Sequence, residues 1–128
     1  MSNGKIKGLG HIGVFINDID VSIDFYTRLG FKMDHREDVA SRNVRVAFMS
    51  AGSCILELVE KPGTSREAGV VDHICMEVDN IEAAVDLAIS NGIQIDPAAI
   101  ETIDVMGGIK NVFFTGPDNE RLEFFTKM

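Results

Sequence analysis

Two histidines and two glutamates occur at matching positions in the two halves of this 128-residue chain. His11 and His73 are each followed by isoleucine, and Glu57 and Glu123 are each preceded by leucine. Both glutamates interrupt apolar runs, where burying an unpaired carboxylate is costly. Two imidazoles and two carboxylates suit a divalent Zn, Ni, Co, Fe or Mn ion. The sequence therefore predicts one metal site built from His11, Glu57, His73 and Glu123.

The repetition favours this metal site over independent structural roles. A lone histidine or glutamate in a strand is usually structural or solvated, but independent residues have no reason to be polar at equivalent places in both halves. His35 has no counterpart and lies among charged residues, so we expect it to be solvated. Cys54 and Cys75 have neither metal-ligand nor redox-motif spacing, and we expect both to be reduced residues of the core.

The elements that must position the four residues also occur twice. Strands are expected over 9–16, 31–37, 43–50 and 53–60 in the first half, and over 71–78, 93–95, 110–115 and 121–126 in the second. A helix with a buried stripe follows the first strand of each half, from an N-cap at Asp18 or Asn80 to Gly30 or Gly92. Residues 96–108 form a long loop, whose Gly107-Gly108 pair is either a turn or a hinged cover. The prediction is one α+β domain of two βαβββ modules, about 6–62 and 68–128.

Four segments carry a resemblance to a known family: residues 10–18, 22–31, 72–79 and 116–124. They resemble the vicinal oxygen chelate (glyoxalase/bleomycin resistance/dioxygenase) superfamily, and most of all a short bacterial glyoxalase I (lactoylglutathione lyase). The resemblance implies cup-shaped mixed sheets around a metal, usually Ni or Co, ligated by His11, Glu57, His73 and Glu123. It also implies a Lewis-acid metal that chelates two neighbouring substrate oxygens, with proton transfer by Glu123 and with Glu57 as its partner.

The resemblance leaves three activities open. The first is a glyoxalase I-type lyase or isomerase acting through an enediolate on a substrate such as a 2-oxoaldehyde thiol hemithioacetal. Phe15 and Lys61 replace the Arg and Asn that hold glutathione in glyoxalase I, so glutathione itself is not implied. Residues 43–58 also resemble methylmalonyl-CoA epimerase, the second alternative. The third is a drug-binding protein of the bleomycin-resistance type, which the four ligands argue against.

The composition limits the classes of partner that we expect the protein to bind. The net charge of −8 disfavours binding to nucleic acid or anionic lipid. A leader sequence and long apolar runs are lacking, which predicts a soluble, cytoplasmic protein without membrane contact. Modules of about 60 residues are too small to be stable on their own, so we expect them to share a core or to complete one another in a homodimer. Five cations could meet an anionic small-molecule substrate but are expected to be surface residues: Arg36, Arg45, Lys61, Arg66 and Lys110.

Overall fold

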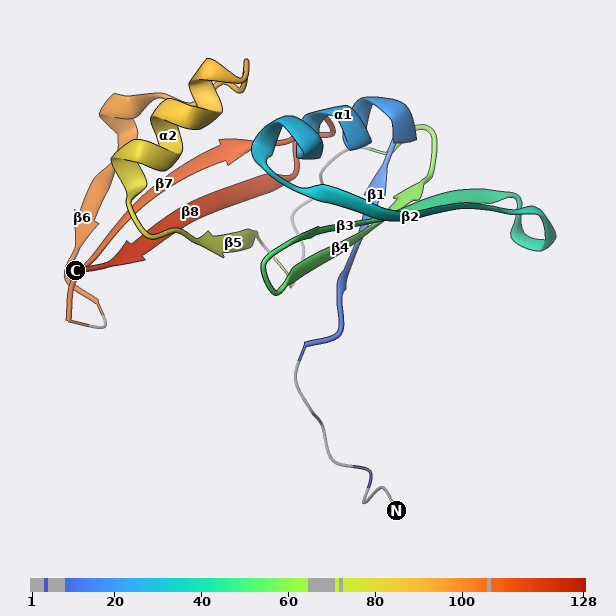
Figure 1. Ribbon diagram of the computed structural model, residues 1–128, viewed down its shortest axis with the longest axis horizontal. Helices are drawn as coiled ribbons and strands as arrows, with labels where there is room; N and C mark the ends of the chain where they lie inside the picture. The colour runs from blue at the N-terminus through green and yellow to red at the C-terminus, as the bar shows by residue number, and fades with distance from the viewer. Residues whose placement is uncertain (1–3, 5–8, 65–70, 72, 106) are drawn as a thin grey trace.

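The chain forms two four-stranded mixed sheets and two helices in the computed structural model, which describes residues 4, 9–64, 71, 73–105 and 107–128 (Figure 1). The strand order in the first sheet is β1 (Ile12–Ile16), β4 (Cys54–Glu60), β3 (Val44–Ala51) and β2 (Lys32–Val39). The second sheet repeats this order with β5 (Ile74–Glu77), β8 (Arg121–Lys127), β7 (Ile109–Thr115) and β6 (Glu101–Ile103). In each sheet the first pair is parallel and the other two are antiparallel. The predicted α+β class is confirmed.

Each helix begins at the predicted N-cap. Asp18 precedes α1 (Ile19–Leu29), and its carboxylate accepts from backbone N–H groups two and three residues further on. Asn80 precedes α2 (Ile81–Ser90), and its side chain accepts from the N–H three residues on. These bonds satisfy donors that have no partner within the first turn of a helix. Gly30 ends α1 with a left-handed φ of 116°, which a residue without Cβ adopts readily.

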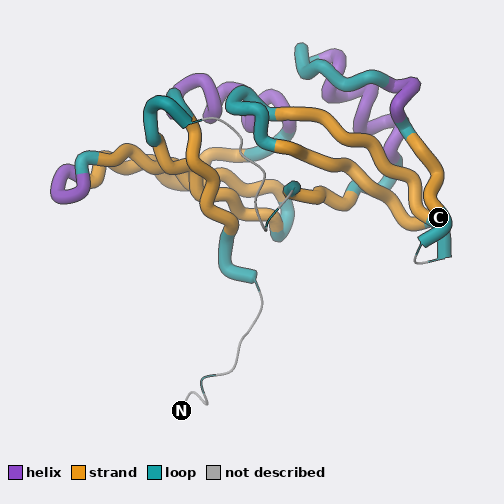
Figure 2. Tube along the Cα trace, turned by 180° about the vertical axis from the view of Figure 1, so that it is seen from behind, coloured by secondary structure: helices purple, strands orange, loops and turns teal. Residues whose placement is uncertain are grey.

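The helices and the two glutamates lie on opposite faces of the sheets. Both helices lie on one side of the molecule (Figures 1 and 2), and the core forms between them and the strands. Leu56 and Leu58 in β4 are fully buried in this core, as is Leu122 in β8. Because successive strand residues alternate between faces, Glu57 and Glu123 lie on the faces turned away from the helices.

The two halves share one core and are joined by the β7–β8 turn. The buried apolar cluster contains residues of both halves, including Ile16 and Val112. The Tyr26 hydroxyl, from α1, donates to Glu120 at 2.8 Å, and the Asn17 backbone N–H donates to Asp118 at 3.0 Å. Burial raises the pKa of Tyr26, and the neighbouring Glu120 carboxylate raises it further. The phenol therefore stays a hydrogen-bond donor at physiological pH.

Three predictions about local structure were wrong. His11 and His73 lie immediately before β1 and β5 rather than inside them. Residues 93–95 form no strand, because Ile93 and Ile95 are buried by packing in the core rather than by pairing. The fourth strand of that half, β6, lies instead within the predicted loop, and all three of its residues are exposed. An exposed edge strand shows no apolar alternation, so the alternation rule could not identify β6 as a strand.

Gly107 and Gly108, which belong to the segment predicted to be a long loop, lie in the turn between β6 and β7. Gly107 and Gly108 have positive φ angles of 81° and 106°, and the Gly108 N–H donates to the Val105 carbonyl at 2.9 Å. The geometry is that of an ordinary tight turn. Met106 lies outside the described residues. Among the described residues, neither helix is long and apolar enough to cross a membrane.

Candidate metal centre

The first histidine and the first glutamate form a close pair on the exposed face of the first sheet. Parallel pairing of β1 with β4 places Gly13 opposite Glu57, and His11 lies two residues before Gly13. The His11 Nε2 and Glu57 Oε1 atoms are 3.3 Å apart. Gly13 lies beside this pair, and a Cβ at that position would be in ordinary contact with the same carboxylate oxygen, at 3.9 Å. The two side chains are 46% and 27% exposed, so the pair is accessible from solvent.

The second half repeats this pair in a more buried setting. Parallel pairing of β5 with β8 places Cys75 opposite Glu123, and His73 lies two residues before Cys75. The His73 Nε2 and Glu123 Oε1 atoms are 3.1 Å apart. The Glu123 side chain is only 9% exposed, against 27% for Glu57. A buried carboxylate needs a partner, so the second pair has the stronger demand for a proton or a cation.

A phenylalanine ring packs edge-to-face against the imidazole in both pairs. Phe48 lies opposite Glu57, and its ring meets His11 at a centroid distance of 5.4 Å and an angle of 88°. Phe113 lies opposite Glu123, and its ring meets His73 at 5.3 Å and 88°. Edge-to-face packing of this kind is favourable for aromatic rings and restricts their rotation. The repeat therefore preserves the orientation of the histidine as well as its identity.

Glu123 accepts a hydrogen bond from a buried side chain of the neighbouring strand. The buried Asn111 amide donates to Glu123 Oε2 at 2.8 Å. One carboxylate oxygen is thus held by Asn111 while the other faces His73. Val46 occupies the corresponding register position in the first half, and its apolar side chain offers Glu57 no donor. Asn111 was not identified from the sequence, although a polar residue inside an apolar strand was the signal that had identified both glutamates.

The structure brings the four predicted ligands together as two pairs rather than as one cluster. Among the residues that the structure describes, no three His, Cys, Asp or Glu side chains lie in an arrangement that could hold a metal ion. The prediction of one four-ligand site is therefore not met inside a single chain. The members of each pair are close because they lie on, or next to, neighbouring strands of the same sheet, and no strand pairing joins the two sheets among the described residues. His35 belongs to neither pair: it is exposed, lies 2.7 Å from Glu37, and has its ring 6.4 Å from that of Phe48.

The donor atoms of each pair fit a divalent metal, although two donors are too few. Imidazole nitrogen and carboxylate oxygen are ordinary ligands of Zn, Ni, Co and Mn, and a structural or catalytic zinc site uses at least three protein ligands. Separations of 3.1 and 3.3 Å let one ion touch both members of a pair, since metal–ligand bonds are about 2.0–2.2 Å. Each pair by itself supplies two donors.

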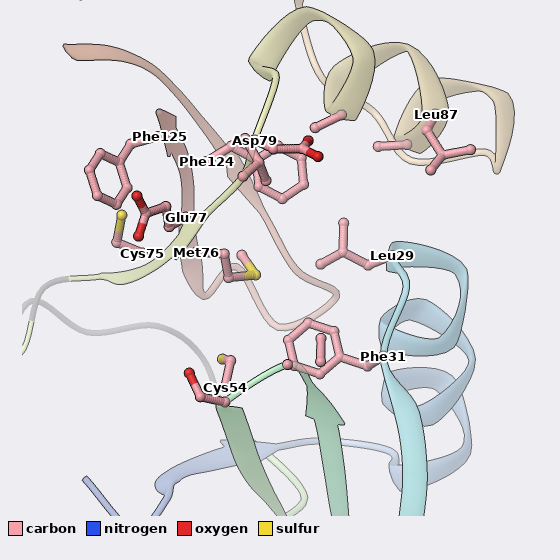
Figure 3. A pocket seen from close by; sticks show the side chains of 16 residues that line it. Leu29, Phe31, Cys54, Cys75, Met76, Glu77, Asp79, Leu87, Phe124 and Phe125 are labelled. Atoms are coloured by element: carbon pink, nitrogen blue, oxygen red, sulfur yellow. The ribbon is translucent and has the colours of Figure 1, made fainter. Parts of the chain in front are cut away.

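The two cysteines line a cleft between the halves. Cys54, at the start of β4, and Cys75, in β5, belong to a cleft of about 840 Å³ whose walls include Phe31, Met76 and Phe124 (Figure 3). Cys75 is exposed, so the prediction that it is a core residue was wrong. Partial desolvation of the sulfur raises the pKa of the Cys75 thiol, and the Glu123 carboxylate raises it further, to about 12. The thiol therefore stays protonated and is a poor metal ligand.

Most of the cations considered as anion-binding residues are engaged elsewhere. Arg36 binds Asp20, Arg45 binds Glu60, and Lys110 binds Glu82. Lys61 lies over the ring of Phe15, with its nitrogen 4.7 Å from the centroid. Arg66 lies outside the described residues.

Comparison with known proteins places the chain in a family. The model of the Glyoxalase/Bleomycin resistance protein/Dioxygenase superfamily matches residues 8–124. The chain therefore belongs to this superfamily, as its motifs predicted.

Relatives of the chain have different activities. It is 31% identical over 91 residues to the mitochondrial methylmalonyl-CoA epimerase of Mus musculus, which is 63% of this chain and 51% of the epimerase. It is 29% identical over 126 residues to YwbC of Bacillus subtilis, which is 94% of this chain and 98% of YwbC. It is 28% identical over 134 residues to lactoylglutathione lyase of Schizosaccharomyces pombe, covering 88% of this chain and 43% of the lyase. The chain spans about half the length of the epimerases that it matches.

Solved structures of the superfamily share the fold. A glyoxalase family protein from Enterococcus faecalis is similar with a TM-score of 0.80 and 25% identity, covering 93% of this chain and 97% of that protein. The fosfomycin resistance protein FosX from Listeria monocytogenes, complexed with Mn(II) and sulfate, has a TM-score of 0.72, with 97% and 95% covered. At 15% identity, the second likeness shows the fold alone.

Proposed function

We propose that this protein is a metal-dependent enzyme of the glyoxalase I type, whose divalent ion is bound by His11, Glu57, His73 and Glu123. The observation that carries the proposal is the duplicated pair, with His–Glu separations of 3.3 and 3.1 Å on the exposed faces of two equivalent sheets. Two such pairs supply four ligands and leave open positions on an octahedral ion for a substrate.

The complete shell forms in a homodimer, in which the first pair of one copy faces the second pair of the other. Within the described part of one chain the pairs do not join. β1 and β5, which carry the histidines at their starts, both lie at sheet edges, where another copy can approach. A two-fold axis then builds two equivalent sites, because each contact between the copies occurs twice.

The chain's own groups have distinct roles in the reaction. A bound divalent ion supplies Lewis acidity toward two neighbouring oxygens of the substrate. Glu123 takes the proton from the adjacent carbon, and Glu57 is its partner at the opposite side of the site. Asn111 donates to Glu123 Oε2, and this hydrogen bond limits rotation of the carboxylate. Phe48 and Phe113 keep the two imidazoles in place during this transfer.

The proposed substrate is an α-oxygenated small molecule, such as the hemithioacetal of a 2-oxoaldehyde and a thiol, and the proposed ion is Ni, Co or Zn, with Mn or Fe as further candidates. The likeness to lactoylglutathione lyase supports this substrate class. A second candidate is epimerisation of a methylmalonyl-CoA-like thioester, favoured by the 31% identity to the mouse epimerase. Both reactions begin with removal of a proton from a carbon beside a carbonyl group. Drug binding without metal is the third candidate, and the four preserved ligands argue against it.

The test is metal uptake followed by a substrate screen. Purified protein stripped of metal is given Zn, Ni and Co in turn, and bound metal is measured by elemental analysis; we expect about one ion per chain. The loaded protein is then assayed with methylglyoxal and several thiols, and with methylmalonyl-CoA. Replacement of His73 by Ala should abolish uptake, whereas His35→Ala, a histidine outside the pairs, should not. Failure of the wild-type protein to bind any of the metals stoichiometrically contradicts the proposal.

A further inference from the structure

The cleft between the two halves has an apolar floor and apolar walls. Phe31, Met76 and Phe124 form the floor and are at most 9% exposed. Leu29, at the end of α1, and Leu87, in α2, line the cleft from the two halves, and Leu87 is 64% exposed (Figure 3). The volume of about 840 Å³ falls within the range of about 300–1,000 Å³ that is usual for small-molecule sites. The size and the lining therefore fit the apolar body of a small organic ligand.

The charged residues of this cleft are both acidic. Glu77 and Asp79 belong to the lining, and none of the described residues that line it is Lys, Arg or His. Both are exposed, and neither carboxylate forms an ion pair in the described part of the chain. Glu77 lies beside Cys75, and Asp79 lies nearer to the start of α2 (Figure 3). The net charge of −8 adds to their negative potential, so the cleft attracts cations and repels anions.

Three aromatic rings in the lining favour a particular kind of cation. They belong to Phe31, Phe124 and Phe125. The face of an aromatic ring carries partial negative charge and attracts a cation, more strongly where water is excluded. Proteins use such rings to recognise quaternary ammonium groups. An inorganic ion would gain from the carboxylates but not from the apolar walls, whereas an organic cation gains from both.

We infer that the cleft between the halves binds an organic cation, whose positive nitrogen lies near Asp79 and Glu77 and whose apolar body packs on the buried floor. This site is separate from the two His–Glu pairs, since neither histidine and neither glutamate of the pairs belongs to its lining. It needs no metal, so the inference does not rest on the proposed function. An anionic ligand and a second copy of the chain are the competing occupants, and the experiment distinguishes them.

Three small probes test the site in the metal-free protein labelled with ¹⁵N. Benzyltrimethylammonium has a ring and a positive charge, tetramethylammonium has the charge without the ring, and 3-phenylpropionate has the ring with a negative charge. Benzyltrimethylammonium should shift the backbone amide NMR resonances of Asp79 and Leu87 and leave that of Glu37, an exposed residue of β2, in place. The other two probes should bind about tenfold more weakly or less, because each lacks one of the two favourable contacts.

Substitutions of exposed residues in and near the cleft complete the test. Leu87→Ala should weaken benzyltrimethylammonium binding about three- to tenfold, and Asp79→Asn about two- to fivefold. Ile89→Ala and Asp86→Asn make the same changes at exposed positions of α2 outside the lining and should leave the affinity unchanged. Wild-type affinity in either cleft variant overturns the site, as does equal binding of 3-phenylpropionate. If no probe shifts Leu87 and Leu87→Ala converts a dimer to a monomer in sedimentation, the cleft is an interface between copies and the inference fails.

Discussion

Replacement of Asn111 by Leu tests how the second half-site is organised. The substitution keeps a side chain of similar size in the strand but removes the amide that donates to Glu123 Oε2 at 2.8 Å. Asn111 is 5% exposed and Glu123 is 7% exposed, so water cannot easily replace the lost donor. The carboxylate then loses the contact that directs its other oxygen toward His73.

The size of the effect follows from the chemistry of this bond. A hydrogen bond to a charged group contributes about 1.5–3 kcal/mol, which corresponds to a roughly 10- to 100-fold change in an equilibrium constant. Removing a hydrogen-bond partner of a metal ligand lowers metal affinity by about the same factor in other proteins. We therefore expect Asn111→Leu to weaken metal binding about 10- to 100-fold while the fold is retained.

The assay is calorimetric titration of metal-free protein with Zn and Co, with urea unfolding of the same samples. Arg45→Leu is the control, because Arg45 also donates to a glutamate carboxylate, but it does so in the first half and to Glu60 rather than to a proposed ligand. That control should leave metal affinity within about twofold of wild type, since its ion pair is partly exposed and remote from the ligands. Equal metal affinity in Asn111→Leu and wild type refutes the positioning role.

Three further predictions concern catalysis, the junction of the halves and acid stability. Glu123→Gln should keep the fold but lower turnover by orders of magnitude, because an amide cannot accept the proton; near wild-type turnover with metal bound would move the base to Glu57. Tyr26→Phe should lower the free energy of urea unfolding by about 1–2 kcal/mol through loss of the bond to Glu120, and an unchanged value would show that this bond does not stabilise the junction of the halves. Arg45, and then the Ile19 N–H, hold the pKa of Glu60 below its usual value. Glu60 therefore stabilises the fold above its unfolded pKa of about 4.3, and this stability is lost as pH falls through the lower folded pKa. Unfolding measured between pH 3 and 7 should show a weaker dependence on acid in Glu60→Gln, and identical curves would contradict this assignment.

The repeated polar residues could be recognised from sequence because they depend on local pattern. Glu57 interrupts an apolar run in which Leu56 and Leu58 are buried, and Glu123 follows the buried Leu122 in the same way. The helix caps Asp18 and Asn80 were equally local, since an N-cap side chain bonds only to the next few residues. These features need no knowledge of how the halves are arranged.

Features that depend on the arrangement of the halves could not be predicted in this way. The sequence pattern contains no information on the distance between the two sheets, so it could not show whether the four ligands meet within one chain, where they form two pairs, or across two copies. Cys75 lies in an apolar run, but alternation turns it to the same face as His73, beside Glu123. Because Ile74 and Met76 are buried, alternation along β5 would have predicted that Cys75 faces away from the core.

The central claim, a metal site shared between two copies, is tested most directly by mixing two inactive variants. His11→Ala and His73→Ala each damage both sites of their own homodimer, so neither variant alone should bind metal stoichiometrically. A mixed dimer combines the intact first pair of one chain with the intact second pair of the other, and restores one of its two sites. After unfolding and refolding together, with mixed dimers verified by native mass spectrometry, metal uptake should recover to about a quarter of the wild-type value for random pairing. Mixed dimers that form but bind no metal would contradict a site built across the two copies.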